Sequence, residues 1–334
     1  MDNSSTTSSE DPINIWNTWA LTVTHEACEY INKKFVAEKR GGDLVIPSPK
    51  LDTDLVMACD QLVNRLIKAY KNPIKMKIDI ARYSRFISPK DTGHNEEREE
   101  KLLQKCPPGH EGTKLIDIPA TIIDASGAII AWYLPDALTN ATQVLTNPIA
   151  CVRSRSICII EGPSSESILK AIARPAAIVT VALRVMHPDQ YFAGLQTISV
   201  LEDKAERNEL PKMSETLKYW ASVFNTLSII SNRETPNHRD HLSMPECFDI
   251  LTTAGNYSNA RMSMPGLQLE FKYDPGCMIA FSGRIVRHGV HAVQGDRIAW
   301  AWYMRDSVHS YAGVPSSGWA RKEHIGVNVS REGA

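Results

Sequence analysis

The chain has 334 residues and a formal net charge of −1, with 43% hydrophobic and 22% charged residues. This composition is typical of a globular protein with one large domain or two modest ones, and it excludes a polycation. An anionic partner would therefore have to meet a local basic patch. Because the sequence has no charged-then-apolar leader and no apolar run of about eighteen residues, we expect neither secretion nor a membrane span.

The seven cysteines form no Cys-x-x-Cys pair, and their number is odd. An odd number of cysteines that lack the spacing of a zinc site favours reduced thiols over a disulfide framework or a zinc ribbon. We therefore expect an intracellular protein.

The first third of the chain is predicted to be mostly helical. Residues 1–12 are small, polar and rich in Ser and Thr, so we expect a disordered tail. Apolar residues at steps of three and four predict one helix over about 16–35, ended by Gly41-Gly42, and another over about 54–70. Residues 13–110 are thus predicted to be an N-terminal helical region, in which residues 89–110 form a charged connector.

A basic stretch covers residues 61–90, with eight Lys or Arg residues and Asp79 as its one acidic residue. One interpretation is a surface that contacts phosphates. The other is a solvated helix face, balanced by the acidic run from Asp91 to Glu100. The sequence leaves both open, and DNA contacts from region 13–110 are a prediction.

From about residue 111 the pattern changes to strands. Residues 121–124 and 128–133 predict a hairpin, and helices are expected over 164–173, 175–186 and 189–203. From Phe224 onward, short apolar segments alternate with good turn sequences such as Asp274-Pro275-Gly276. Several short strands at this spacing predict a barrel or jelly roll, packed on long helices in an α+β domain.

The most informative motif is His238-x-Asp240, at the end of a predicted strand. Alternate residues of an extended segment point the same way, so both side chains can reach one metal ion. A later histidine would complete the two-histidine, one-carboxylate triad of non-haem iron(II) oxygenases. His288 is favoured over His291, because Gly283 and Gly289 flank it and it lies nine residues before Arg297. His241 and His309 are further competitors.

Arg297 begins an apolar, strand-like run, Ile298 to Trp302. An arginine in such a strand needs an anion, and the distal carboxylate of 2-oxoglutarate would supply one through a bidentate pair. The alternative is a structural ion pair with an acidic residue elsewhere. Arg233, five residues before His238, could meet the proximal carboxylate of the same ligand.

Several segments resemble the TET/JBP family of DNA-modifying iron(II)/2-oxoglutarate dioxygenases, in its fungal, transposon-associated branch. The resemblance covers roughly residues 115–320. The segments that carry it are IDASGAIIAWYLP, MHPDQYFAGL, NRETPNHRD, FDILTTAGNYSNARM, PGCMIAFSGRIVRHGV and GDRIAWAWYMRDSVH.

The resemblance implies a double-stranded β-helix over residues 111–325, with Fe(II) at His238, Asp240 and His288 and with O2 and 2-oxoglutarate as cosubstrates. The latter would be held by Arg297 and Arg233. The implied substrate is 5-methylcytosine in duplex DNA, flipped out of the helix and oxidised to hydroxymethyl, formyl and carboxyl forms.

In the family, an aromatic residue six positions after the distal arginine stacks on the flipped base, and here that residue is Tyr303. Two positions further on, animal members use a histidine for the base edge, whereas this chain has Arg305 followed by Asp306. Base recognition must therefore differ in detail, and these three residues are the predicted substrate contacts.

The departure at Arg305 and Asp306 keeps N6-methyladenine open as a second or main substrate. Two further alternatives are a hydroxylase of a protein or small molecule, and a catalytically silent reader of methylated DNA. The complete triad and both arginines argue against the silent reader. We expect a monomer, and a DNA substrate would place it in the nucleus.

Overall fold

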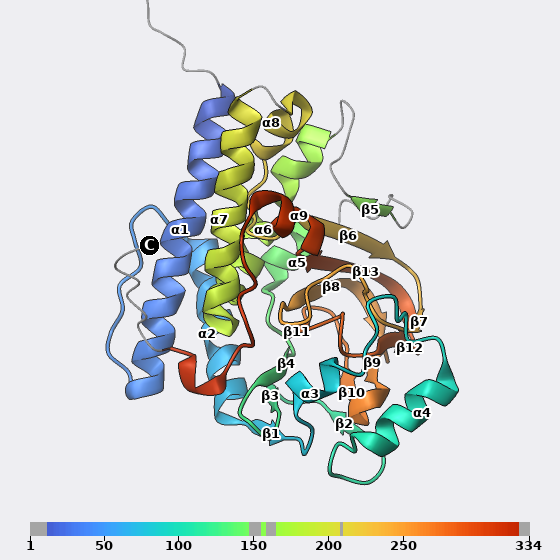
Figure 1. The fold of residues 1–334 in the computed structure, drawn as a ribbon. Helices are drawn as coiled ribbons and strands as arrows, with labels where there is room; N and C mark the ends of the chain where they lie inside the picture. The colour runs from blue at the N-terminus through green and yellow to red at the C-terminus, as the bar shows by residue number, and fades with distance from the viewer. Residues whose placement is uncertain (1–11, 147–154, 158–164, 208–209, 327–334) are drawn as a thin grey trace, which may run out of the picture.

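The computed structural model describes residues 12–146, 155–157, 165–207 and 210–326, and Figure 1 draws the remainder as a thin grey trace. The predicted disordered tail thus lies outside the described residues, apart from Pro12. Cys28, Cys59, Cys106, Cys247 and Cys277 are free thiols, and the other two cysteines lie outside the described part. None of the described helices is long and apolar enough to cross a membrane.

Eight antiparallel strands form a jelly roll. In the larger sheet the order is β6-β13-β8-β11, and in the smaller sheet it is β7-β12-β9-β10. The chain crosses repeatedly between the sheets, as in two Greek keys folded on each other. The strands are β6 (Thr226–Ser231), β7 (Thr235–His238), β8 (Asp249–Ser258), β9 (Arg261–Met264), β10 (Leu269–Lys272), β11 (Met278–Phe281), β12 (His288–His291) and β13 (Gln294–Tyr303).

Shorter strands widen both sheets. The predicted hairpin is present as an antiparallel pair beside β11, and a parallel strand from the N-terminal region extends it. Another short strand lies on the far side of β6, and one pairs with β10 at the edge of the smaller sheet. These strands are β1 (Pro73–Lys75), β2 (Lys114–Ile116), β3 (Ala120–Ile123), β4 (Ile129–Leu134) and β5 (Arg155–Ile157).

Long helices cover the outer face of the larger sheet, while the smaller sheet covers its inner face (Figure 1). The result is an α+β fold with a jelly-roll core, which confirms the predicted fold class. The helices of this layer are α1 (Pro12–Arg40), α2 (Thr53–Lys71), α5 (Asn140–Thr146), α6 (Ser165–Met186), α7 (Pro188–Glu206) and α8 (Pro211–Leu217).

Strand β13 shows how one strand serves two layers. Ile298, Trp300 and Trp302 belong to the core between the sheet and the helices. The alternate residues, which include Arg297 and Tyr303, face the space between the two sheets. The twofold side-chain period of an extended strand thus separates packing residues from cavity residues.

Three features of the first half differ from the sequence-based predictions. The N-terminal helical region also supplies strand β1 to the larger sheet, and it contains the short helix α3 (Ile80–Ser84). The segment predicted to be a connector, residues 89–110, contains the helix α4 (Glu96–Lys105). The helices predicted over 164–173 and 175–186 are one helix, α6, with Pro175 inside it. Proline removes one helical hydrogen bond. Burial of neighbours such as Ile172, Ala176 and Val179 stabilises the continuous helix against that loss.

His187 precedes α7 and is almost fully buried. Its Nδ1 accepts a hydrogen bond from the Gln190 amide at 3.4 Å, and its Nε2 lies 3.2 Å from the carbonyl oxygens of Glu246 and Gly318. Burial lowers the pKa of His187 to about 4. The neutral ring therefore joins the start of α7 to two distant loops.

We expect protonation of His187 in the unfolded state to destabilise the fold in mild acid. Because the folded-state pKa is below the unfolded value, stability is full above about pH 6.5 and is lost as the pH falls towards 4. Between pH 7.5 and pH 5 the loss is about 2 kcal/mol. Urea unfolding of wild type and His187→Gln at both pH values measures it; an equal pH dependence in the two proteins would contradict the assignment.

Candidate active site

Three side chains from two strands and the following loop form the only cluster with metal-ligand geometry in the described parts of the chain. It contains His238, Asp240 and His288, whose ligand atoms all lie within 4.8 Å of one another. His238 ends β7 and His288 begins β12, and the two residues are direct partners in the antiparallel register. The pairing of the two strands, rather than a local turn, therefore brings the histidines together.

Hydrogen bonds fix the orientation of both imidazole rings. Nδ1 of His238 lies 2.9 Å from the Pro236 carbonyl oxygen, and Nδ1 of His288 lies 3.0 Å from that of Val286. When each Nδ1–H donates to its carbonyl, the Nε2 lone pair is left to bind a metal. The two Nε2 atoms lie 3.6 and 3.5 Å from oxygens of the Asp240 carboxylate.

The charges of this group suit a divalent cation. Burial lowers the pKa of His288 to about 4, so its ring is neutral. Burial works against ionisation of Asp240, but the contact with His238 and the charges of nearby histidines outweigh it and lower the pKa of Asp240. The site thus offers an ionised carboxylate and a neutral imidazole, and the three residues fit the iron(II) facial triad.

Gly283 lies against the back of the Asp240 carboxylate. Its carbonyl oxygen accepts the Asp240 amide at 2.9 Å, and its own amide donates to Asp249 at 3.2 Å. A Cβ at this position would lie 2.6 Å from Oδ2 of Asp240 and 2.4 Å from Oδ2 of Asp249. The glycine is required because a side chain here would push the ligand carboxylate out of place.

The cluster opens onto a cavity of about 320 Å³ in the jelly-roll interior, walled by residues of both sheets. Arg297 reaches into it from β13 and is 1% exposed. Its Nη2 donates to the Arg233 carbonyl oxygen at 2.6 Å, whereas its Nε has no partner in the described part of the chain. No carboxylate in the described residues forms an ion pair with Arg297, so the structural ion pair considered from sequence is absent there.

Tyr273 is a cavity residue that the sequence reasoning missed. Its ring lies 5.8 Å from the guanidinium of Arg297, and its buried hydroxyl has no hydrogen-bond partner among the described residues. Burial raises the pKa of Tyr273 well above its usual value, so the hydroxyl remains a donor. Two buried donors without protein partners at one end of a cavity fit the carboxylate of a bound ligand. A Tyr directly after a strand gave no sequence signal for this role.

The remaining residues that the sequence predicted for cosubstrate or substrate binding differ in their position relative to the cavity. Arg233 is exposed and lines the cavity. Tyr303 and Arg305 line it as well; the Tyr303 hydroxyl is 3.1 Å from the Ser228 hydroxyl and accepts a hydrogen bond from Arg305 at 3.3 Å. Asp306 is exposed at the start of α9 (Asp306–Ala312) and does not line the cavity.

The competing histidines do not join the cluster. His291 is exposed and lies 3.4 Å from Glu270, while His309 is buried against Thr197 at 3.1 Å. His241 lines the cavity. The structure therefore brings together the three residues that the sequence favoured and leaves the alternatives in other contacts.

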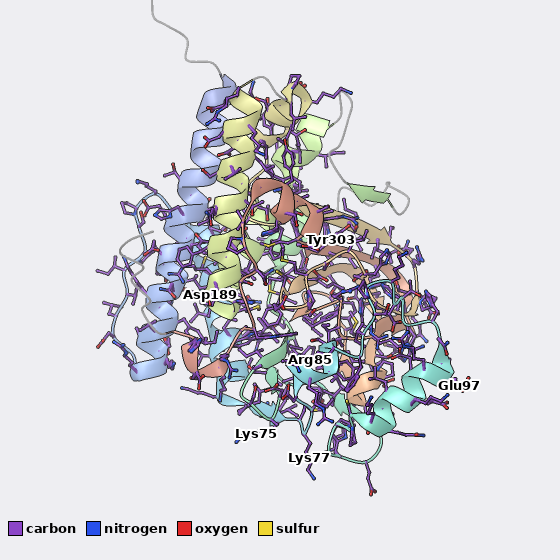
Figure 2. All side chains as sticks on the ribbon, in the orientation of Figure 1. Lys75, Lys77, Arg85, Glu97, Asp189 and Tyr303 are labelled. Carbon is purple, nitrogen blue, oxygen red and sulfur yellow. The ribbon has the colours of Figure 1, made fainter. Side chains whose placement is uncertain are left out.

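The basic stretch is spread over α2, β1 and α3, and none of its eight cationic residues lines the cavity. Arg65 forms an ion pair with Asp136. Lys75 and Lys77 lie at the lower end of the molecule, far from Tyr303 (Figure 2). A contact between this stretch and DNA stays a prediction.

Comparison with known proteins identifies the class of this site. The family model Tet_JBP, described as the oxygenase domain of the 2OGFeDO superfamily, matches residues 145–306, which include the whole cluster and Arg297. The protein is thus a 2-oxoglutarate- and iron(II)-dependent dioxygenase. Residues 145–306 thus match the oxygenase domain of the TET/JBP family, in agreement with the resemblance seen in the sequence.

Among solved structures, the chain matches NgTET1 in complex with 5mC DNA. The TM-score is 0.40 and the sequence identity 12%, and the match covers 70% of this chain and 93% of that chain. No curated protein matches the sequence.

We expect Gly283→Ala to abolish tight metal binding while the protein remains folded. The new methyl group must displace the Asp240 carboxylate, and loss of one of three ligands should weaken binding at least tenfold. Titration with Co(II), followed by its absorption spectrum, measures the change, with thermal unfolding of the metal-free variant as the control. Wild-type affinity in a folded variant would show that the glycine is dispensable.

Removing the two buried donors should affect cosubstrate binding by different amounts. Arg297→Lys loses the guanidinium fork, so KM for 2-oxoglutarate should rise about 10- to 100-fold. Tyr273→Phe loses one neutral donor, and a rise of about two- to tenfold is expected. Because the Tyr273 hydroxyl has no protein partner, this variant should keep wild-type thermal stability. Steady-state kinetics of succinate formation gives both values; unchanged KM values would place the carboxylate elsewhere.

Proposed function

We propose that the protein oxidises the methyl group of 5-methylcytosine in duplex DNA, using Fe(II), 2-oxoglutarate and O2. The observation that carries the proposal is the Tet_JBP match across the residues that hold the His–Asp–His cluster and the buried Arg297.

Different residues of the cavity would bind the metal and the cosubstrate in such a reaction. The His–Asp–His cluster would hold the metal at one wall, and Arg297 with Tyr273 would offer donors for a carboxylate. When bound, iron(II) supplies an oxidising centre at which decarboxylation of 2-oxoglutarate to succinate is coupled to insertion of oxygen into a C–H bond. The protein's residues position both reactants and exclude water.

A base inside a duplex cannot reach this buried centre, so the target nucleotide must be flipped out, at a cost of a few kcal/mol. Tyr303 presents an aromatic ring at the cavity wall, and the guanidinium of Arg305 lies 5.3 Å from the centre of that ring. We assign Tyr303 to stacking on the flipped base and Arg305 to donating to acceptor atoms on its edge. Asp306 is exposed and does not line the cavity, so we assign it no contact with the target base.

The same proposal includes successive oxidation to the hydroxymethyl, formyl and carboxyl forms, and a monomer that acts on DNA in the nucleus. An arginine at the base edge can donate to acceptors of either cytosine or adenine. For this reason N6-methyladenine, whose N-methyl group the same oxidation would remove as formaldehyde, is the second substrate to test.

The deciding experiment supplies methylated duplexes with Fe(II), ascorbate and 2-oxoglutarate and measures the nucleosides by mass spectrometry. We expect loss of 5-methylcytosine with matching succinate, and no loss with His238→Ala. A duplex with N6-methyladenine and an unmethylated duplex are the parallel arms. Consumption of N6-methyladenine alone would replace the proposed substrate, and consumption of neither base would favour a hydroxylase of proteins or small molecules.

A further inference from the structure

Arg239, the residue between the two metal ligands His238 and Asp240, is one of the most deeply buried charges in the structure. It is 2% exposed, and its side chain points away from the cavity. Both terminal nitrogens donate to the carboxylate of Glu99 at 2.6 Å, and Nε donates to the Ile285 carbonyl oxygen at 3.0 Å. The Arg239 amide also donates to the Thr92 carbonyl oxygen at 2.9 Å.

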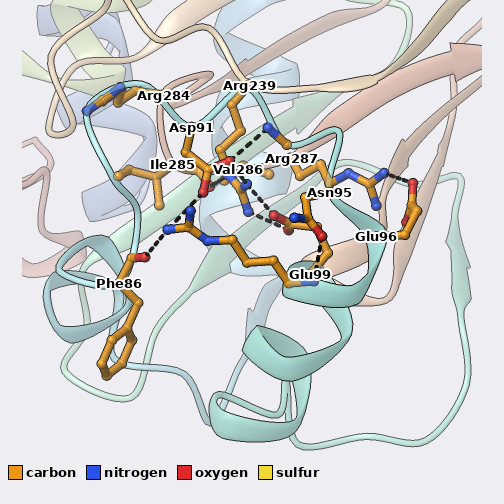
Figure 3. A network of polar contacts seen from close by, with 12 residues as sticks. Phe86, Asp91, Asn95, Glu96, Glu99, Arg239, Arg284, Ile285, Val286 and Arg287 are labelled. Carbon is orange, nitrogen blue, oxygen red and sulfur yellow. Dashed lines mark hydrogen bonds and ion pairs between the residues drawn. The ribbon is translucent and has the colours of Figure 1, made fainter.

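A second ion pair connects the same helix to the third ligand. Arg287 directly precedes His288, and its guanidinium pairs with Glu96. Glu96 and Glu99 are three residues apart on α4, so they lie on the same face of the helix. Figure 3 shows both pairs reaching from α4 to Arg239 and Arg287, which are the chain neighbours of the candidate metal ligands. Hereafter these two ion pairs are called the α4 clamp.

Further contacts tie the segment before α4 to the same loops. Arg284 donates to the Pro89 carbonyl oxygen at 2.7 Å, and Asp91 lies 3.5 Å from Arg239 and 3.2 Å from Arg98. The acidic run that follows the basic stretch is therefore not merely a solvated counter-charge. Part of it faces inward, towards the two loops of the metal cluster.

The position of Asp240 depends on its backbone. In the described residues its carboxylate contacts the two cluster histidines, and no other donor holds it in place. In an extended segment, a rotation at Arg239 would turn His238 and Asp240 together, because both neighbours point to the opposite side. Holding Arg239 by its side chain and by its amide therefore fixes the direction of two ligands at once.

We propose that the α4 clamp is a positioning element for the metal centre, with Arg239 and Glu99 as its principal residues. A buried ion pair is weak evidence for stability, because desolvation of both charges offsets their attraction. Its location between the ligands supplies the reason for keeping it. The inference rests on the proposed metal centre, and it adds a determinant of metal affinity that lies outside the cavity.

The test measures Co(II) binding to the full-length, metal-free protein by absorption spectroscopy, together with thermal unfolding. For Glu99→Gln we expect about 10- to 100-fold weaker binding and an altered Co(II) spectrum. For Glu96→Gln, whose carboxylate is 69% exposed, we expect about two- to fivefold weaker binding. The matched control is Glu97→Gln, because the Glu97 side chain is 77% exposed on the same helix and, among the described residues, pairs only with Lys101; this variant should bind Co(II) as wild type does.

A double variant separates positioning from stability. Glu99→Gln leaves the Arg239 charge buried without its partner, so thermal stability should fall. Arg239→Gln/Glu99→Gln removes that charge and should recover part of the stability, while its Co(II) affinity stays as low as in the single variant. A purely structural pair would instead lower stability and leave the affinity of the folded variant unchanged.

The outcomes separate the two levels of inference. Wild-type affinity and spectrum in folded Glu99→Gln, or in the double variant if the single one does not fold, would overturn the clamp alone. If the His238→Ala variant binds Co(II) as tightly as the wild-type chain does, the assignment of the metal centre is wrong. The proposed role of the α4 clamp is then overturned as well. Affinity lost in step with the Glu97→Gln control would also count against the clamp, because the effect would then be general to the charge of α4.

Discussion

The site depends on one backbone pairing, in which His238 at the end of β7 lies directly opposite His288 at the start of β12. These residues are fifty positions apart in the sequence, and the intervening chain forms four strands of the jelly roll before it returns. A one-residue slip in this register would turn one histidine to the other face of the sheet. The jelly roll therefore holds the imidazole rings of His238 and His288 next to each other.

The helical layer supports the same site from behind. Trp300 and Trp302 anchor β13 to the helices, while Arg297 and Tyr303 on the same strand point into the cavity. A rigid, close-packed outer face thus fixes the strand that carries residues for two tasks, anion binding and the cavity wall.

Two buried arginines differ in their hydrogen-bond partners, and this difference separates a structural charge from one that is free to bind a ligand. Arg239 and Arg297 are both almost fully buried. Arg239 has a bidentate carboxylate partner, so its charge is compensated within the protein. Arg297 has a carbonyl oxygen and an unpartnered Nε, and the unpartnered hydroxyl of Tyr273 lies in the same cavity. Buried donors without partners are costly, and a ligand carboxylate would remove that cost.

The sequence by itself predicted the α+β class, the three residues that the structure brings together as a candidate metal cluster and the arginine that is buried in β13, because these rest on local periodicity and on residue types with few other uses. It did not determine the roles of Tyr273, Arg239 or Glu99, or the helix α4 inside a charged segment. Their roles depend on which residues lie opposite them after folding. Glu99 is 140 positions from Arg239, and a charged residue at such a separation has no pattern that marks it as paired. Only the tertiary structure, by burying both charges together, decided that they belong to the support of the metal cluster.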